Sequence, residues 1–190
     1  MTPFEYVITL ESFVYALALA HLLSGAGRLL LARERVRFSG LQTLVMVNAA
    51  VTVFVDWLSA WPERGATEWD FPDIAILFVY AMANYFLCAA ATPEAVAGEP
   101  LDLRAFYWSH RRLFYGIYAL LNAIGVVASH PLLKTSNPSL FATYTLWALP
   151  YFLPSALAIL VKARWAQWVS GFGLLALSLG WGLVFTSALR

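Results

Sequence analysis

The sequence predicts an all-α membrane protein, a polytopic transmembrane bundle of six helices that forms one integral membrane domain over residues 1–190. Composition is the first observation behind this prediction. Hydrophobic residues make up 61% of the chain and charged residues 12%, with a mean hydropathy of +0.70, whereas soluble proteins are about half apolar and about a quarter charged. The second observation is that the apolar residues gather in runs of the ~20 residues that cross a bilayer.

Charged residues, proline and glycine separate these apolar runs and set the expected helix boundaries. The expected helices lie near residues 5–31, 40–61, 72–92, 112–130, 138–162 and 166–189. The fourth run is the shortest because a Ser-His-Pro sequence at 129–131 interrupts it. Only the short turn around Lys162 separates the last two runs, so a five-helix protein is the alternative. Glu5 and Glu11 stand where a signal peptide would be positively charged, which favours a retained first helix.

Basic residues divide unequally between the two sides of this arrangement. One side collects nine of the 12 Lys and Arg residues, Arg28, Arg33, Arg35, Arg37, Arg104, Arg111, Arg112, Lys162 and Arg164. The other side has three, Arg64, Lys134 and Arg190. Because Lys and Arg near spans are retained in the cytoplasm, both termini are expected outside. Residues 57, 61 and 69 are tryptophans near the first outer loop, as an interfacial aromatic belt would require.

The segment 101–111 mixes aromatic and aliphatic residues with Arg104, His110 and Arg111. This composition predicts a short interfacial helix that lies on the membrane surface and leads into the fourth span. Its basic residues would contact anionic lipid, as cytoplasmic juxtamembrane segments commonly do.

Glu11 is the most unusual residue of the first span, since it lies about two turns inside the helix. A carboxylate at that depth is expected to be paired, protonated or exposed to a water-filled cavity. Candidate partners on the next three helices are Asn48, Thr52, Asp56, Asp73, Tyr80, Asn84 and Asn122. Their helical spacing predicts a polar interior with Glu11, Asp56 and Asp73 in its outer half. The alternative for Asp56 and Asp73 is that they are helix-end residues solvated by water.

His21 lies deeper in the first span, along one face with Ser24 or Gly25 and Arg28. Arg28 is near the end of the span, where a long side chain can reach the lipid headgroups. A small residue between polar ones allows another helix to approach closely, so this face is expected to point into the bundle. His21 is either a hydrogen-bonded interior residue or a ligand or proton carrier, and it lies ~15 Å along the helix from Glu11.

Proline and glycine residues distinguish the last two expected helices. Pro150 and Pro154, near the middle of the fifth run, remove backbone donors and are expected to form a bend or hinge. Such a bend can expose carbonyls to a solute pathway or be purely architectural. In the sixth run four glycines, Gly171, Gly173, Gly180 and Gly182, predict a close-packing surface.

Common enzyme signatures are absent from the sequence, including Cys-x-x-Cys, His-Glu-x-x-His and phosphate-binding glycine loops. A haem would need two facing axial histidines, which His21 and His110 supply poorly. No cofactor is therefore assigned, and any metal is unknown. Cys88 has no partner for a disulfide. The net charge of +1 gives no support for nucleic-acid binding.

The stretch "PFEYVITLESFVYALALAHLLSGAGRLL", followed by "RERVRF", resembles the opening of a set of small bacterial inner-membrane proteins. The set has an F-E-Y start and an A-H-L-L-x-G-x-x-R-L pattern, which correspond here to Glu5, His21, Gly25 and Arg28. The resemblance covers about the first forty residues and implies a bacterial cytoplasmic (inner) membrane. It implies no activity.

The sequence thus favours a channel or transporter for a small solute or ion, or a ligand sensor. Its expected site residues are Glu11, His21, Asn48, Asp56 and Asn84. The alternatives are a non-catalytic accessory subunit of a membrane complex and, third, a haem- or quinone-linked redox protein. The lipid bilayer is the expected partner, and glycine- and alanine-rich helix faces leave room for a homo-oligomer.

Overall fold

The computed structural model describes residues 2–94 and 100–187, and these form six long α-helices. The helices are α1 (Pro3–Leu31), α2 (Gly40–Ser59), α3 (Phe71–Ala91), α4 (Leu103–Ala128), α5 (Ser139–Leu160) and α6 (Arg164–Ser187). Short 3-10 helices, η1 (Trp61–Gly65) and η2 (His130–Lys134), follow α2 and α4. All six α-helices are long and apolar enough to cross a membrane, so the predicted fold class is confirmed. Residues 188 and 189 of the last predicted helix lie outside the described residues.

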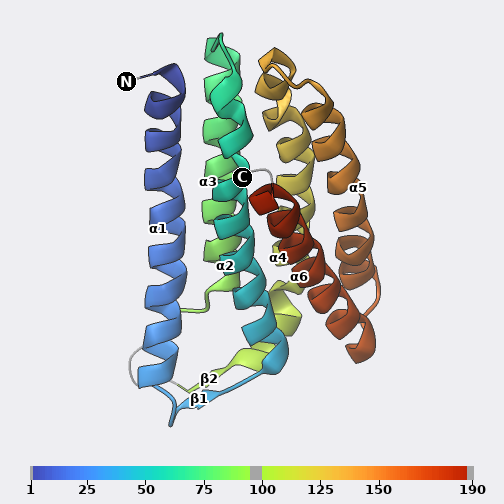
Figure 1. The fold of residues 1–190 in the computed structure, drawn as a ribbon. Coiled ribbons are helices and arrows are strands. Elements are labelled where there is room, and N and C mark those ends of the chain that lie inside the picture. Colours follow the sequence, from blue (N-terminus) through green and yellow to red (C-terminus); the bar gives the residue numbers. More distant parts are fainter. Residues whose placement is uncertain (1, 95–99, 188–190) are drawn as a thin grey trace.

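Successive helices run in opposite directions through the bundle (Figure 1). The β1 strand (Val36–Arg37) and the β2 strand (Leu101–Asp102) pair in parallel at one end, where the α5–α6 turn also lies. The other end carries η1 and η2, which contact each other. Helix α1 packs mainly on α3, α2 on α6, and α4 on both α3 and α5. Because the helices alternate in direction, the loops rich in Arg and Lys lie together at the β1–β2 end.

Helix α4 differs from the sequence prediction. The expected interfacial segment at 101–111 is not separate, because α4 begins at Leu103 and continues without a break to Ala128. Asp102 starts the helix by accepting hydrogen bonds from the backbone amides of Arg104 (2.8 Å) and Ala105 (3.0 Å). The Ala105 and Arg104 amides, together with nearby Arg37, lower the pKa of the Asp102 carboxyl group. A strong N-terminal cap and strand pairing therefore fix the helix start nine residues before the expected position 112.

Arg111 lies on the side of this segment that packs inside the bundle. Its side chain is buried, and its guanidinium donates to the backbone carbonyls of Ala158 and Ile159 at the end of α5. These carbonyls have no partner within their own helix, so the arginine caps α5. Arg111, which the sequence suggested as a lipid contact, thus joins α4 to α5 in the structure.

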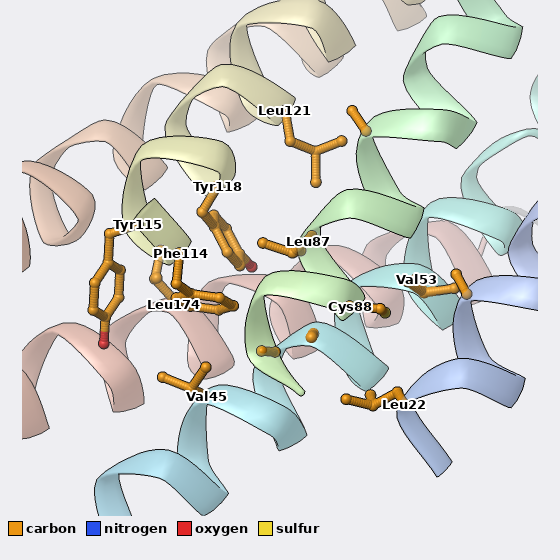
Figure 2. Close-up of a cluster of buried hydrophobic side chains, with 14 of the residues drawn as sticks. Leu22, Val45, Val53, Leu87, Cys88, Phe114, Tyr115, Tyr118, Leu121 and Leu174 are labelled. Atoms are coloured by element: carbon orange, nitrogen blue, oxygen red, sulfur yellow. The ribbon is translucent and has the colours of Figure 1, made fainter. Parts of the chain in front are cut away.

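A hydrophobic core joins all six helices, with Tyr151 and Ala158 contributed by α5, and Figure 2 shows part of this core. It contains Leu22 from α1, Val45 and Val53 from α2, Leu87 and Cys88 from α3, Phe114, Tyr115, Tyr118 and Leu121 from α4, and Leu174 from α6. Large apolar side chains also cover the outside of the bundle; Leu31, Phe71 and Leu153, for example, are exposed by 90%, 83% and 77%. An outer surface of this kind is suited to lipid chains.

Glycines permit the closest helix contacts, as the sequence predicted for Gly25 and for α6. A Cβ added at Gly25 would lie 2.1 Å from Cγ2 of Thr92, and one at Gly171 would lie 2.5 Å from Cδ2 of Leu44. Helix α5 continues through both Pro150 and Pro154. Their role as a hinge stays a prediction.

Candidate functional site

A cavity of about 80 Å³ lies inside the bundle near the η1–η2 end. Residues from all six helices and from η1 line it. One water molecule requires roughly 10–15 Å³ of cavity volume, so this cavity holds a few water molecules or one very small ligand. The lining is unusual for the interior of a membrane protein because it combines three acidic side chains with a wall of aromatic rings. The acidic residues are Glu11, Asp56 and Glu63, and the aromatic residues are Tyr15, Tyr80, Tyr118, Tyr144, Trp147, Tyr151 and Trp181.

Glu11 reaches the cavity from α1, in agreement with the sequence prediction that it faces a polar interior. Its side chain is only 3% exposed, and its Oε1 atom has no hydrogen-bond partner among the described residues. A buried polar atom without a partner is costly, and such an atom in a native protein calls for a ligand, a water or a proton. The cavity beside Glu11 provides space for one of these.

Asp56 reaches the cavity from α2 and is held from α3. The Asn84 side-chain amide donates to the Asp56 carboxylate at 2.9 Å, and Tyr80 also interacts with this carboxyl group. Asn84 is fully buried and does not itself line the cavity. The two residues that the sequence placed on facing stripes do meet, and Asn84 positions Asp56.

Glu63 was not among the residues selected from the sequence. It lies in η1, directly after Pro62, and is 5% exposed. The sequence groups it with the acidic residues of the first outer loop, where a solvated role is the default. Its only sequence signal is the Trp-Pro-Glu order at 61–63, which favours a tight helical turn at the end of a span. That turn directs the carboxyl group back into the bundle.

The described lining contains no Lys, Arg or His side chain. Arg64, the nearest basic residue in sequence to Glu63, instead lies over the Trp61 ring and donates to the Trp61 carbonyl. Three carboxyl groups therefore share one cavity without a basic countercharge. This arrangement favours a positively charged occupant or proton uptake by the carboxyl groups.

The polar ends of several lining rings are engaged by the protein. The Tyr118 hydroxyl contacts the Thr52 hydroxyl at 2.6 Å and the Ser178 hydroxyl at 3.0 Å. Ser59 accepts from two rings, since Trp181 Nε1 donates to its hydroxyl at 2.8 Å and Tyr144 donates to its carbonyl. These bonds lock the rings in place, so the aromatic wall is preorganised.

Two predicted site residues lie away from the cavity. Asn48 donates to the carbonyls of Leu44 (2.9 Å) and Gly171 (3.0 Å), and it thereby links α2 to α6. His21 is half-buried, and its ring lies 5.8 Å from that of Tyr85 between centroids. The structure does not bring either residue to Glu11, because His21 lies ten residues further along α1 and Asn48 is bonded to α6.

Asp73 belongs to a separate ionic cluster at the η1–η2 end. It forms a capping box with Asp70 at the start of α3, and it accepts from Lys134 at 2.6 Å and from His130 at 3.1 Å. The interpretation of Asp73 as a helix-end residue is thus supported, although its side chain is buried by the cluster. Lys134 also pairs with Asp70 at 2.8 Å, so this network ties η2 to α3.

The chemistry of the described residues offers no compact metal centre, since no three His, Cys, Asp or Glu side chains gather closely enough. The three histidines have different neighbours. His21 packs near Tyr85, His110 stacks on Phe106, and His130 contacts Asp73.

No known protein family, curated protein or solved structure matches the chain. The fold and the cavity define its class as a multi-pass membrane protein with six helices and an acidic, aromatic-lined internal cavity.

Proposed function

We propose that this protein binds a small cationic solute in the internal cavity and either conducts it across the membrane or senses it. The observation that carries the proposal is the Glu11 carboxyl group, which is buried beside the cavity with one oxygen unpartnered. Asp56 and Glu63 add acidic groups to the same space. Acidic groups that line a membrane-protein interior select positive charge and commonly mark solute or proton pathways.

We further propose that the η1–η2 end faces the outside of a bacterial cytoplasmic membrane, so that both termini are external. The concentration of Lys and Arg at the β1–β2 end supports this orientation through the positive-inside rule. The cavity would then lie in the external half of the bundle, on the side from which a solute arrives. Pro150 and Pro154 lie within α5, the helix that supplies Tyr144, Trp147 and Tyr151 to the cavity wall, so a hinge there would alter the cavity.

The proposal is tested with purified protein in proteoliposomes on a solid-supported membrane. Concentration jumps of NaCl, KCl or methylammonium chloride are applied at constant ionic strength, and charge movement is recorded. We expect at least one cation to produce a protein-dependent current that Glu11→Gln reduces by tenfold or more. The matched control is Glu5→Gln, which changes a carboxylate of the same helix outside the cavity and preserves the capping box with Thr2.

A sensor would bind a cation without moving it. In that case the same cation raises the thermal unfolding temperature of the protein in detergent while no sustained current follows. The absence of both current and stabilisation for all three cations would contradict the proposal. It would favour the accessory-subunit alternative, in which polar residues serve only helix association.

A further inference from the structure

The chemistry of the cavity wall narrows the class of cation. This inference rests on the proposed function, since it concerns the same cavity. The placement of the acidic groups gives the first limit on the ligand. Glu11, Asp56 and Glu63 come from three different elements, α1, α2 and η1. They do not converge on one point as a metal centre would. Divalent cations such as Ca²⁺ require several oxygen ligands at 2.3–2.6 Å around a single centre, so this wall suits a more diffuse positive charge.

Aromatic rings supply the second part of the recognition. Tyr144 and Trp181 meet edge to face with centroids 4.8 Å apart, and Trp147 lies 5.7 Å from Trp181. All three line the cavity. Because Ser59 already binds the polar ends of Tyr144 and Trp181, these residues contribute mainly ring surface to the space. Ring surface attracts organic ammonium ions through the ring quadrupole, and the interaction strengthens when the site excludes water.

Cavity size sets the third limit. The volume of about 80 Å³ is roughly half of the ~150 Å³ that accommodates benzene in an engineered apolar cavity. A ligand of about two to five non-hydrogen atoms therefore fits without rearrangement of the bundle.

Hydrogen bonding distinguishes among small ammonium ions. The unpartnered Glu11 Oε1 is an acceptor, so a ligand that carries an N–H donor can bond to it. A primary ammonium provides three donors, whereas a quaternary ammonium provides none. Charge-assisted bonds of this kind are about twice as strong as neutral ones.

We propose that the cavity binds a small protonated amine of the methylammonium class. Its N–H groups bond to the Glu11 carboxylate, and its alkyl end lies against the rings of Tyr144, Trp147 and Trp181. Asp56 and Glu63 contribute the remaining negative charge of the site.

The experiment measures binding to the full-length protein in detergent at pH 7, where a primary alkylamine is protonated. Titrations with methylammonium chloride, tetramethylammonium chloride, KCl and methanol are followed by isothermal calorimetry and by tryptophan fluorescence. Salts are exchanged at constant ionic strength. We expect saturable binding of methylammonium that is at least tenfold tighter than that of the other three probes. Trp147→Leu is expected to weaken methylammonium binding severalfold.

Glu11→Gln is expected to weaken methylammonium binding by at least tenfold, while Glu5→Gln leaves it unchanged. Glu63→Gln is the second variant, used if Glu11→Gln does not give a monodisperse, helical protein, and a loss of affinity is expected there too. Equal affinity in both cavity variants and the wild type would overturn the site.

The other outcomes separate this inference from the proposed function. Tighter binding of K⁺ or tetramethylammonium would overturn the amine assignment and leave a cation site intact. Equal binding of methanol would show that charge is not recognised and would overturn both proposals. Binding of no probe at all would overturn the amine assignment, and the NaCl arm of the current measurement would then decide the proposed function.

Discussion

Asn84 holds the Asp56 carboxylate at the cavity wall while lying outside the cavity itself. The bond joins α3 to α2 inside the bundle, and Asn84 itself is fully buried. Asn48 is built in the same way, with one bond to its own helix and one to another helix, but it serves the α2–α6 contact. Two asparagines that look equivalent in the sequence therefore have different tasks, one at the site and one in packing.

The residue-scale prediction concerns the Asn84–Asp56 pair. Asn84→Leu is expected to lower the free energy of unfolding by about 0.5–2 kcal/mol, since hydrogen bonds between membrane helices average about 0.6 and reach about 1.7 kcal/mol. In an Asp56→Leu background the same substitution should cost less, because its acceptor is already gone. Reversible unfolding in mixed detergent measures all four proteins. An identical cost in both backgrounds would show that the bond carries no coupling energy.

Contact between α1 and α3 depends on the missing side chain of Gly25. The methyl group of Thr92 occupies the space in which a Cβ would lie, and the Thr92 hydroxyl is bonded to the Cys88 carbonyl at 2.7 Å. The threonine therefore cannot rotate away without losing that bond. Gly27, two residues later on the same helix, has nothing within 4 Å of an added Cβ.

The element-scale prediction uses these two glycines as a matched pair. Gly25→Ala is expected to destabilise the protein by about 1–3 kcal/mol through overpacking. Gly27→Ala should be neutral or stabilising by up to about 1 kcal/mol, because alanine favours a helix. The second substitution Thr92→Ser removes the methyl group but keeps the hydroxyl, and it should restore the stability of Gly25→Ala. Thermal unfolding of the wild type and of these three variants measures the effect, and similar values for both alanine variants would contradict the packing argument.

For the whole molecule, the unequal distribution of basic residues predicts which end is cytoplasmic. Cys88 is buried, so cysteines introduced into exposed loop positions are the reactive ones. Thr67, between η1 and α3, and Glu34, between α1 and β1, are both exposed. A membrane-impermeant maleimide is expected to label Thr67→Cys in intact cells and to label Glu34→Cys only after lysis. The opposite pattern would reverse the orientation, and the wild type with Cys88 alone is the background control.

Composition and hydropathy determine by themselves that this chain forms six membrane helices. The reason is local, since each run of apolar residues partitions into the bilayer according to its own length and charge. The same argument selects Glu11 and Asp56 as interior residues, because a carboxylate within an apolar span is costly wherever the helix packs. Both residues do line the cavity.

Only the tertiary structure decides how each helix is rotated and what each polar group meets. A helix that is apolar on nearly all sides carries little information about which face turns inward. For this reason the sequence could not separate Asn48 from Asn84, and it could not place Arg111 at the end of α5. Glu63 enters the cavity because the 3-10 helix that follows α2 directs its side chain inward. Contacts between residues far apart in the chain, rather than the character of any one segment, assemble the acidic, aromatic site.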